Sequence, residues 1–175
     1  IEDSPSASEY ADIFLFQLYP YASVHLGPEG MLGGEAQNRV AGFWRALGKN
    51  PPPEPDHLAA LLGLYATLSE QVRPEQKVSN ELSGFSEAEA VLITQGRDAL
   101  LQEHIAPWVP AYLERVIEIA SGPYRGWAVL LDKVLQVELV RVGHPERLPL
   151  HLRESPALDD PQTEGADAFI SGLLA

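Results

Sequence analysis

The chain has 175 residues, of which 45% are hydrophobic and 21% charged, a balance that predicts one globular domain over residues 1–175 and excludes a disordered chain. Its 25 acidic and 12 basic residues give a formal charge of −13, which repels nucleic acid and anionic lipid and favours a cationic partner. Cysteine is absent, which excludes disulfides, thiolate catalysis and Cys-ligated metal sites. No apolar stretch approaches the ~20 residues that span a bilayer, and we expect neither an integral membrane segment nor an export signal.

Apolar residues at helical spacing predict a series of helices separated by clusters of Pro and Gly. The first is expected over residues 8–18. Residues 20–34 carry several Gly and Pro residues and are expected to form an irregular connection. Two helices follow over residues 36–47 and 55–72, and the second has the clearest amphipathic pattern in the chain.

The second half of the chain continues the helical pattern. A Ser-x-x-Glu capping box at residues 86–89 predicts the start of a helix that reaches residue 103, and a further helix is expected over residues 109–120. Residues 124–142 are apolar on most sides, which predicts a helix near the centre of the bundle. After a long connection, a final helix is expected over residues 163–174. Because no run shows the alternation of a half-buried strand, the sequence predicts an all-α fold, an irregular bundle of about six to seven helices.

The sequence Glu-Pro-Asp-His at residues 54–57 lies directly before the clearest helix. Pro55 suits the first turn of a helix, and Glu54 and Asp56 offset the positive end of its dipole, so capping explains three of the four residues. Capping does not explain His57, whose neutral imidazole both donates and accepts hydrogen bonds. The segment is therefore a candidate binding site as well as a helix start.

A second candidate is the aromatic and polar stretch at residues 19–30, which contains Tyr21 and Ser23. Binding residues often lie on such loops. The alternative interpretation is a rigid loop whose Tyr rings cover the edge of the core.

Five histidines are present, but none has the spacing of a metal-binding helix, and we expect structural or solvent-facing roles for them. The chain also lacks a Gly-x-Ser-x-Gly elbow, a phosphate-binding loop and a dinucleotide-binding turn. We therefore predict neither an enzyme nor a protein with a cofactor or metal of its own.

Taken together, Pro-Tyr-x-Ser-Val-x-Leu-Gly-Pro-Glu-Gly at residues 20–30 and Glu-Pro-Asp-His-Leu at residues 54–58 resemble motifs of the TorD/DmsD/NarJ family of redox-enzyme maturation chaperones. His-Ile-Ala-Pro-Trp at residues 104–108 is similar to that family's His-x-x-Pro-Trp segment. The order and spacing of the three motifs match as well. The resemblance runs over residues 10–174, nearly the whole chain.

This resemblance implies an all-helical cytoplasmic chaperone. Its partner would be an apo molybdopterin oxidoreductase catalytic subunit, held by its twin-arginine signal peptide until the cofactor is inserted and export begins. The residues that we expect at the signal-peptide site are Glu54, Pro55, Asp56 and His57, with Tyr21 and Ser23 as second contributors. The acidic residue usual in the family at position 22 is Ala22 here, and Pro107 and Trp108 are expected to pack. The family commonly continues beyond this point, so we also expect a C-terminal segment of the fold to be missing.

The charge and hydrophobicity of the chain fit this partner, because a cationic leader peptide with an apolar run suits an acidic chain with an apolar helix. Three alternatives stay open. One is a NarJ-like assembly chaperone for a nitrate reductase subunit. Another is a nucleotide-binding helical protein, which the missing phosphate loop disfavours. The last is a purely structural helical protein that is part of a larger assembly. A flat, exposed apolar face that forms a homodimer would favour this alternative.

Overall fold

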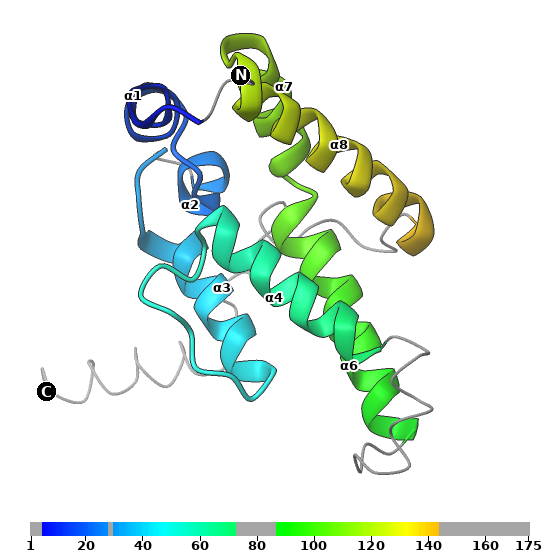
Figure 1. Ribbon diagram of the computed structural model, residues 1–175. Coiled ribbons are helices and arrows are strands. Elements are labelled where there is room, and N and C mark those ends of the chain that lie inside the picture. Colours follow the sequence, from blue (N-terminus) through cyan, green and yellow to red (C-terminus); the bar gives the residue numbers. More distant parts are fainter. Residues whose placement is uncertain (1–4, 28–29, 73–86, 144–175) are drawn as a thin grey trace, which may run out of the picture.

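The computed structural model describes residues 5–27, 30–72 and 87–143, and within these ranges every named element is a helix (Figure 1). Seven are α-helices and two are π-helices: α1 (Ala7–Tyr10), η1 (Ala11–Gln17), α2 (Ala22–Leu26), α3 (Gly34–Ala46), α4 (Leu58–Gln71), α6 (Glu87–Leu100), η2 (Leu101–Ile105), α7 (Val109–Ile119) and α8 (Gly122–Val142). The predicted all-α fold is confirmed. The single domain over residues 1–175 stays a prediction. The final helix over 163–174 and Ser86 of the capping box lie outside the described residues.

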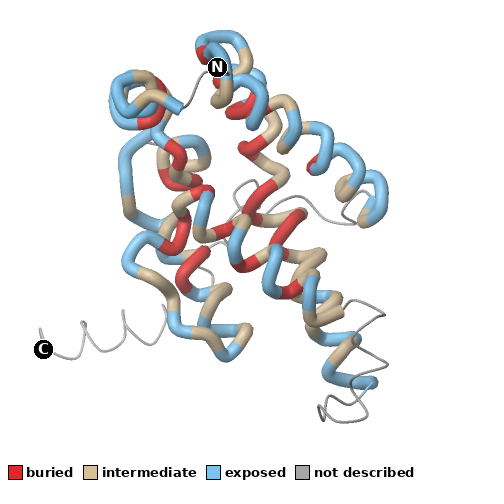
Figure 2. Tube along the Cα trace, viewed as in Figure 1, coloured by how far each residue is buried: buried red, intermediate tan, exposed pale blue. Residues whose placement is uncertain are grey.

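The core forms where α4, α7 and the junction of α6 with η2 come together. Along α4, Leu58, Leu61, Leu64 and Leu68 recur at helical spacing and are all buried. They pack in one cluster with residues such as Leu113 of α7. Figure 2 shows the buried parts of the chain gathered toward the middle of the molecule, with exposed surface on the outer helices.

The first predicted helix divides into two kinds of turn. Its first four residues are α-helical, whereas η1 is π-helical, and the Leu18 N–H bonds to the Ile13 carbonyl at 2.7 Å, five residues earlier. Ile13 and Phe14, neighbours on η1, are both buried. π-Helical turns are often found at functional sites, and Phe14 proves to line the cavity described below.

The prediction of an irregular connection over residues 20–34 is wrong in part, because α2 lies within it. A helix of five residues gains little from local propensity. Its first turn is instead held by a carboxylate that comes from residue 56, through a hydrogen bond from the Ser23 N–H. Local composition could not reveal that long-range bond.

The predicted place of residues 124–142 at the bundle centre is also wrong. α8 packs mainly along α7, and of its side chains only Ala128 and Leu135 are buried. Figure 1 shows α8 at the outer edge of the molecule. The sequence shows that the helix is apolar on most sides, but not which sides another helix covers.

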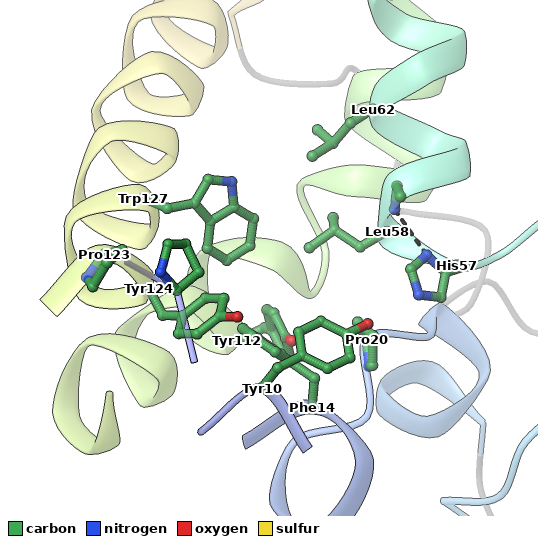
Figure 3. Close-up of a pocket in the computed structure, with 12 residues that line it drawn as sticks. Tyr10, Phe14, Pro20, His57, Leu58, Leu62, Tyr112, Pro123, Tyr124 and Trp127 are labelled. Atoms are coloured by element: carbon green, nitrogen blue, oxygen red, sulfur yellow. Dashed lines mark hydrogen bonds between the residues drawn. The ribbon is translucent and has the colours of Figure 1, made fainter. Parts of the chain in front are cut away.

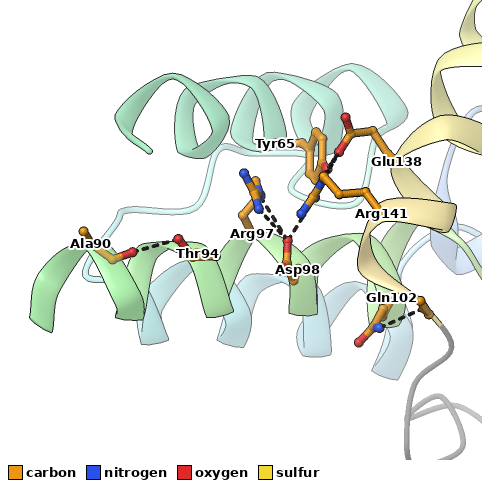
Figure 4. A network of polar contacts seen from close by, with 9 residues as sticks. Tyr65, Ala90, Thr94, Arg97, Asp98, Gln102, Glu138 and Arg141 are labelled. Atoms are coloured by element: carbon orange, nitrogen blue, oxygen red, sulfur yellow. Dashed lines mark hydrogen bonds and ion pairs between the residues drawn. The ribbon is translucent and has the colours of Figure 1, made fainter. Parts of the chain in front are cut away.

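The carboxyl-terminal part of α8 is joined to α4 and α6 by polar side chains (Figure 4). The Tyr65 hydroxyl donates to Glu138 at 2.6 Å, and Arg141 donates to Asp98 at 3.0 Å. Burial, together with the hydrogen bond to Glu138, raises the pKa of Tyr65 to about 12, so the phenol stays protonated. These contacts set the spacing between α4 and α8, and the cavity described below lies between these two helices.

Candidate functional site

The two sequence motifs meet in the folded chain. Tyr21 and His57 form an isolated antiparallel bridge, and the Leu58 N–H donates to the Pro20 carbonyl at 2.8 Å. The Ala22 N–H donates to the Asp56 carbonyl at 3.0 Å. Backbone hydrogen bonds therefore join two segments that lie more than thirty residues apart in the sequence, and both motifs belong to one structural unit.

Asp56 lies inside this unit, with none of its surface exposed. Its Oδ2 accepts a hydrogen bond from the Ser23 N–H at 3.0 Å, and its Oδ1 has no hydrogen-bond partner. The carboxylate thereby satisfies a donor in the first turn of α2, which has no acceptor within its own helix. The structure shows Asp56 holding the two motifs together, and its part in peptide binding stays a prediction.

The other expected residues divide between the interior and the surface. Ser23 is fully buried, and its hydroxyl accepts a hydrogen bond from the Gly33 N–H at 3.1 Å. Pro55 is buried as well, whereas Glu54 is exposed and Tyr21 and His57 are partly exposed. Only these last three present side chains that a partner could touch.

Replacing Asp56 with Ala is expected to lower the free energy of unfolding by about 1–3 kcal/mol, because the buried Ser23 N–H loses its acceptor. Asp56→Asn keeps an oxygen at that place and is expected to cost less. Urea unfolding followed by helical circular dichroism measures both. An Asp56→Ala protein as stable as the parent would show that the carboxylate does not hold α2.

His57 begins α4 with its own ring. The Nδ1 atom accepts a hydrogen bond from the Ala59 N–H at 3.0 Å, so the neutral ring carries its proton on Nε2. The ring meets Tyr21 edge to face, with centroids 4.8 Å apart. The ring nitrogen that remains available is therefore a donor, suited to a carbonyl oxygen and unsuited to a guanidinium group.

Tyr21 lies between this ring and the exposed carboxylate of Glu54. Burial raises the pKa of the Tyr21 hydroxyl, and a hydrogen bond to Glu54 raises it further. The phenol therefore keeps its proton at neutral pH and donates a hydrogen bond to Glu54, whose side chain is exposed.

A cavity of about 730 Å³ opens beside His57, between α4 on one side and α8 on the other (Figure 3). Its lining is mostly apolar and aromatic: Pro5, Tyr10, Phe14, Pro20, His57, Leu58, Ala59, Leu62, Tyr112, Pro123, Tyr124 and Trp127. No Asp, Glu, Lys or Arg is among these residues. The cavity therefore favours an uncharged, apolar occupant.

The aromatic rings of the lining support one another. Phe14 lies 5.2 Å from Tyr10, 5.5 Å from Tyr124 and 6.1 Å from Trp127, measured between ring centroids. The hydroxyls of Tyr112 and Tyr124 donate to the backbone carbonyls of Leu18 and Ser6, each at 3.3 Å. Bound at their polar ends, these rings turn apolar surface toward the cavity.

Sequence reasoning missed most of this lining. Tyr10 and Phe14 belong to the helix expected over residues 8–18, and Tyr124 and Trp127 to the helix expected at the bundle centre; none of the four was predicted to line a site. Their amphipathic spacing was visible, but their convergence on one cavity depends on how distant helices pack. Within residues 5–27, 30–72 and 87–143, no cluster of three or more metal-ligating side chains occurs.

Two sets of known proteins are similar to this chain. Residues 3–114 match the family described as "Nitrate reductase delta subunit". A "Chaperone protein TorD" of Vibrio vulnificus strain YJ016 is 30% identical over 135 residues, which cover 71% of this chain and 58% of the relative. A protein of the same name from strain CMCP6 is 29% identical over 135 residues, with the same coverage. The chain thus matches 58% of the length of these curated relatives.

Proposed function

This chain belongs to the nitrate reductase delta subunit family, and from that membership and the geometry of its cavity we propose that it is a maturation chaperone for a molybdopterin oxidoreductase. It binds the twin-arginine signal peptide of the catalytic subunit beside residues 54–57. It holds the apo subunit in the cytoplasm until the cofactor has been inserted. The similar proteins are named as chaperones, a non-enzymatic role, which supports this assignment.

One observation carries the proposal: a large apolar cavity lies directly beside the Glu-Pro-Asp-His motif. A signal peptide has an apolar run of roughly 7–15 residues, which needs apolar surface to cover it. At ~25 cal/mol per Å², burying about 200 Å² of apolar surface yields about 5 kcal/mol. Burial in the cavity therefore supplies most of the affinity.

The arginine pair is held outside the cavity, because the lining contains no carboxylate. Glu54 is exposed, three residues before His57 of the lining. Each exposed ion pair contributes only about 0.2–1 kcal/mol. Glu54 and the charge of −13 steer the cationic leader, whereas the rings of the cavity retain it.

The residues of the two motifs have different roles in this proposal. Glu54 accepts hydrogen bonds from a guanidinium group, and the His57 Nε2–H donates to a backbone carbonyl of the peptide. Tyr21 orients both side chains. Asp56, Pro55 and Ser23 act indirectly, by keeping the two motifs in register.

Replacing Trp127 with Ala is expected to weaken the binding of a synthetic twin-arginine peptide about 10-fold, the effect of losing roughly 1.4 kcal/mol from an aromatic anchor. Trp127 is only partly buried, so the fold should survive the substitution. Isothermal titration calorimetry measures both dissociation constants. Val140→Ala, on the same helix but 83% exposed and outside the cavity, is the matched control and should bind like the parent. Equal affinity of the Trp127→Ala protein would remove the cavity from the proposed function.

The family match favours a second candidate client, because its description names nitrate reductase. In that case the bound segment is the N-terminus of a nitrate reductase subunit, a remnant of an export signal. Co-expression with each kind of catalytic subunit, followed by mass spectrometry of what co-purifies, separates the two clients. The peptide titration by itself does not.

A further inference from the structure

The cavity occupies only the first turns of the two helices that face each other across it. On the α4 side its lining runs from His57 to Leu62, and on α8 it runs from Pro123 to Trp127. Figure 3 shows Leu62 and Trp127 on opposite walls. Both helices are described along their whole length, and no residue of α4 after Leu62 and none of α8 after Trp127 lines the cavity. The cavity therefore stops while both helices continue.

Immediately past the cavity, a side chain of α4 is bonded to α8 (Figure 4). Tyr65 follows Leu62 by three residues, on the same side of α4. Its hydroxyl donates to Glu138 Oε2 at 2.6 Å and accepts from Arg141 Nη2 at 3.0 Å. Arg141 also donates to Glu138 at 2.8 Å and to Asp98 of α6 at 3.0 Å. A chain that followed the space between α4 and α8 would meet this polar bridge.

An apolar peptide has nothing to offer in exchange for these contacts. The ring of Tyr65 packs against the core cluster, and its hydroxyl bonds to two charged groups, which makes both hydrogen bonds stronger than neutral ones. Leucine or alanine side chains pushed between Tyr65 and Glu138 would leave the hydroxyl and the carboxylate without their partners. The bridge therefore forms a stable end to the apolar space.

We propose that Tyr65 is a specificity-determining residue, which closes the cavity at this end and limits the length of apolar segment that the site reads. This inference rests on the proposed function and adds the extent of the bound segment. From His57 to Tyr65 the chain advances by eight residues, about 12 Å at 1.5 Å per residue, so a helical peptide beside α4 has room for about eight residues. An extended peptide has room for fewer.

The size of the cavity sets a similar limit. A helix about 10 Å across that rises 1.5 Å per residue fills roughly 120 Å³ per residue, so a cavity of about 730 Å³ holds roughly six residues. A leader's apolar run has roughly 7–15 residues. The site therefore reads the part of the run that follows the arginines, and the remainder stays outside the cavity.

Isothermal titration calorimetry with three synthetic twin-arginine peptides tests this limit. In each peptide the arginines are followed by four, eight or twelve residues of alternating Leu and Ala, and then by the same polar tail. For the parent protein we expect the dissociation constant to fall at least about 10-fold between the first and second peptides, because more apolar surface is buried. It should change less than about 2-fold between the second and third, because the added residues are not covered.

Two substitutions of Tyr65 test the cause of the limit. Tyr65→Ala removes the ring and both hydrogen bonds, and should bind the twelve-residue run at least about 5-fold more tightly than the eight-residue run. Tyr65→Phe removes both hydrogen bonds but keeps the ring against the core, so it retains the fold and should show the same preference at about 2- to 3-fold. Glu118→Ala is the matched control. It breaks the exposed Arg115–Glu118 pair on α7, which has the i,i+3 spacing of Glu138 and Arg141, and should keep the limit of the parent.

A parent affinity that keeps rising from eight to twelve residues would overturn the limit. A limit that stays at eight residues in both Tyr65 variants would overturn Tyr65 as its cause, while the peptides still bind. If none of the three peptides binds the parent protein, the proposed function fails, and this inference fails with it.

Discussion

Replacing Leu61 with Ala is expected to lower the free energy of unfolding by about 2–5 kcal/mol, because Leu61 is completely buried and the smaller side chain leaves a cavity. Leu61 lies on α4 among the core leucines, one residue before Leu62 of the peptide cavity. Urea unfolding of the parent and the variant gives the difference.

Leu92→Ala on α6 is the matched control, since Leu92 is 64% exposed and the same truncation there should change stability by less than about 0.5 kcal/mol. An equal loss in the two variants would contradict the position of the core. Peptide affinity of Leu61→Ala, measured where the variant is still fully folded, should stay close to that of the parent, because Leu61 does not line the cavity.

Lowering the pH from about 6.5 to about 4 is expected to destabilise the protein through His104. Its ring is almost completely buried and lies against Phe43, with centroids 4.8 Å apart. Burial is the main cause that lowers the pKa of His104 from 6.5 to about 4; the charge of Glu103 raises this pKa by less, and the charge of Arg39 lowers it by less.

The direction of the effect follows from proton uptake. Below its ordinary pKa of 6.5, His104 binds a proton in the unfolded chain but stays neutral in the folded one down to about pH 4. The stability contributed by the neutral ring is therefore complete above pH 6.5 and is lost as the pH falls through that window. The loss is on the order of 3 kcal/mol when the pH has reached the folded-state pKa, at about 1.4 kcal/mol per pKa unit.

His104→Leu removes the titrating group and keeps an apolar side chain against Phe43. Its free energy of unfolding should depend less on pH than that of the parent between pH 6.5 and 5. Part of this pH dependence should remain, because burial lowers the pKa of His25 as well. Urea midpoints across that range test this, and parallel curves for the two proteins would exclude His104 as the source.

The roles of the histidines could be predicted only in part from residue type and spacing. The expectation of structural or solvent-facing roles holds for His25, which stacks on Trp108, and for the buried His104. His144 and His151 lie outside the described residues. At His57 the structure adds a ring that caps α4 through Nδ1 and leaves a donor beside the cavity. Only the folded structure shows which ring nitrogen of His57 accepts the capping hydrogen bond.

The packing role expected for Trp108 is confirmed, since its ring is buried and its indole N–H donates to the His104 carbonyl at 2.9 Å. By contrast, Asp56 was expected at the signal-peptide site together with its neighbours in the motif, and the structure buries it completely. Sequence neighbours at a helix start can point in opposite directions, and the contact that buries Asp56 comes from Ser23, thirty-three residues away.

The sequence by itself determined the helical class, the main helices and the motif at residues 54–57, because helix periodicity, Pro and Gly breaks and short motifs are local properties. Only the tertiary structure decided that α8 lies at the edge, that Asp56 lies inside and that rings from η1, α7 and α8 converge on one cavity. The physical reason is that an apolar face lowers the free energy wherever it is covered. Which partner covers it, and which face stays open for another protein, depends on contacts between distant parts of the chain.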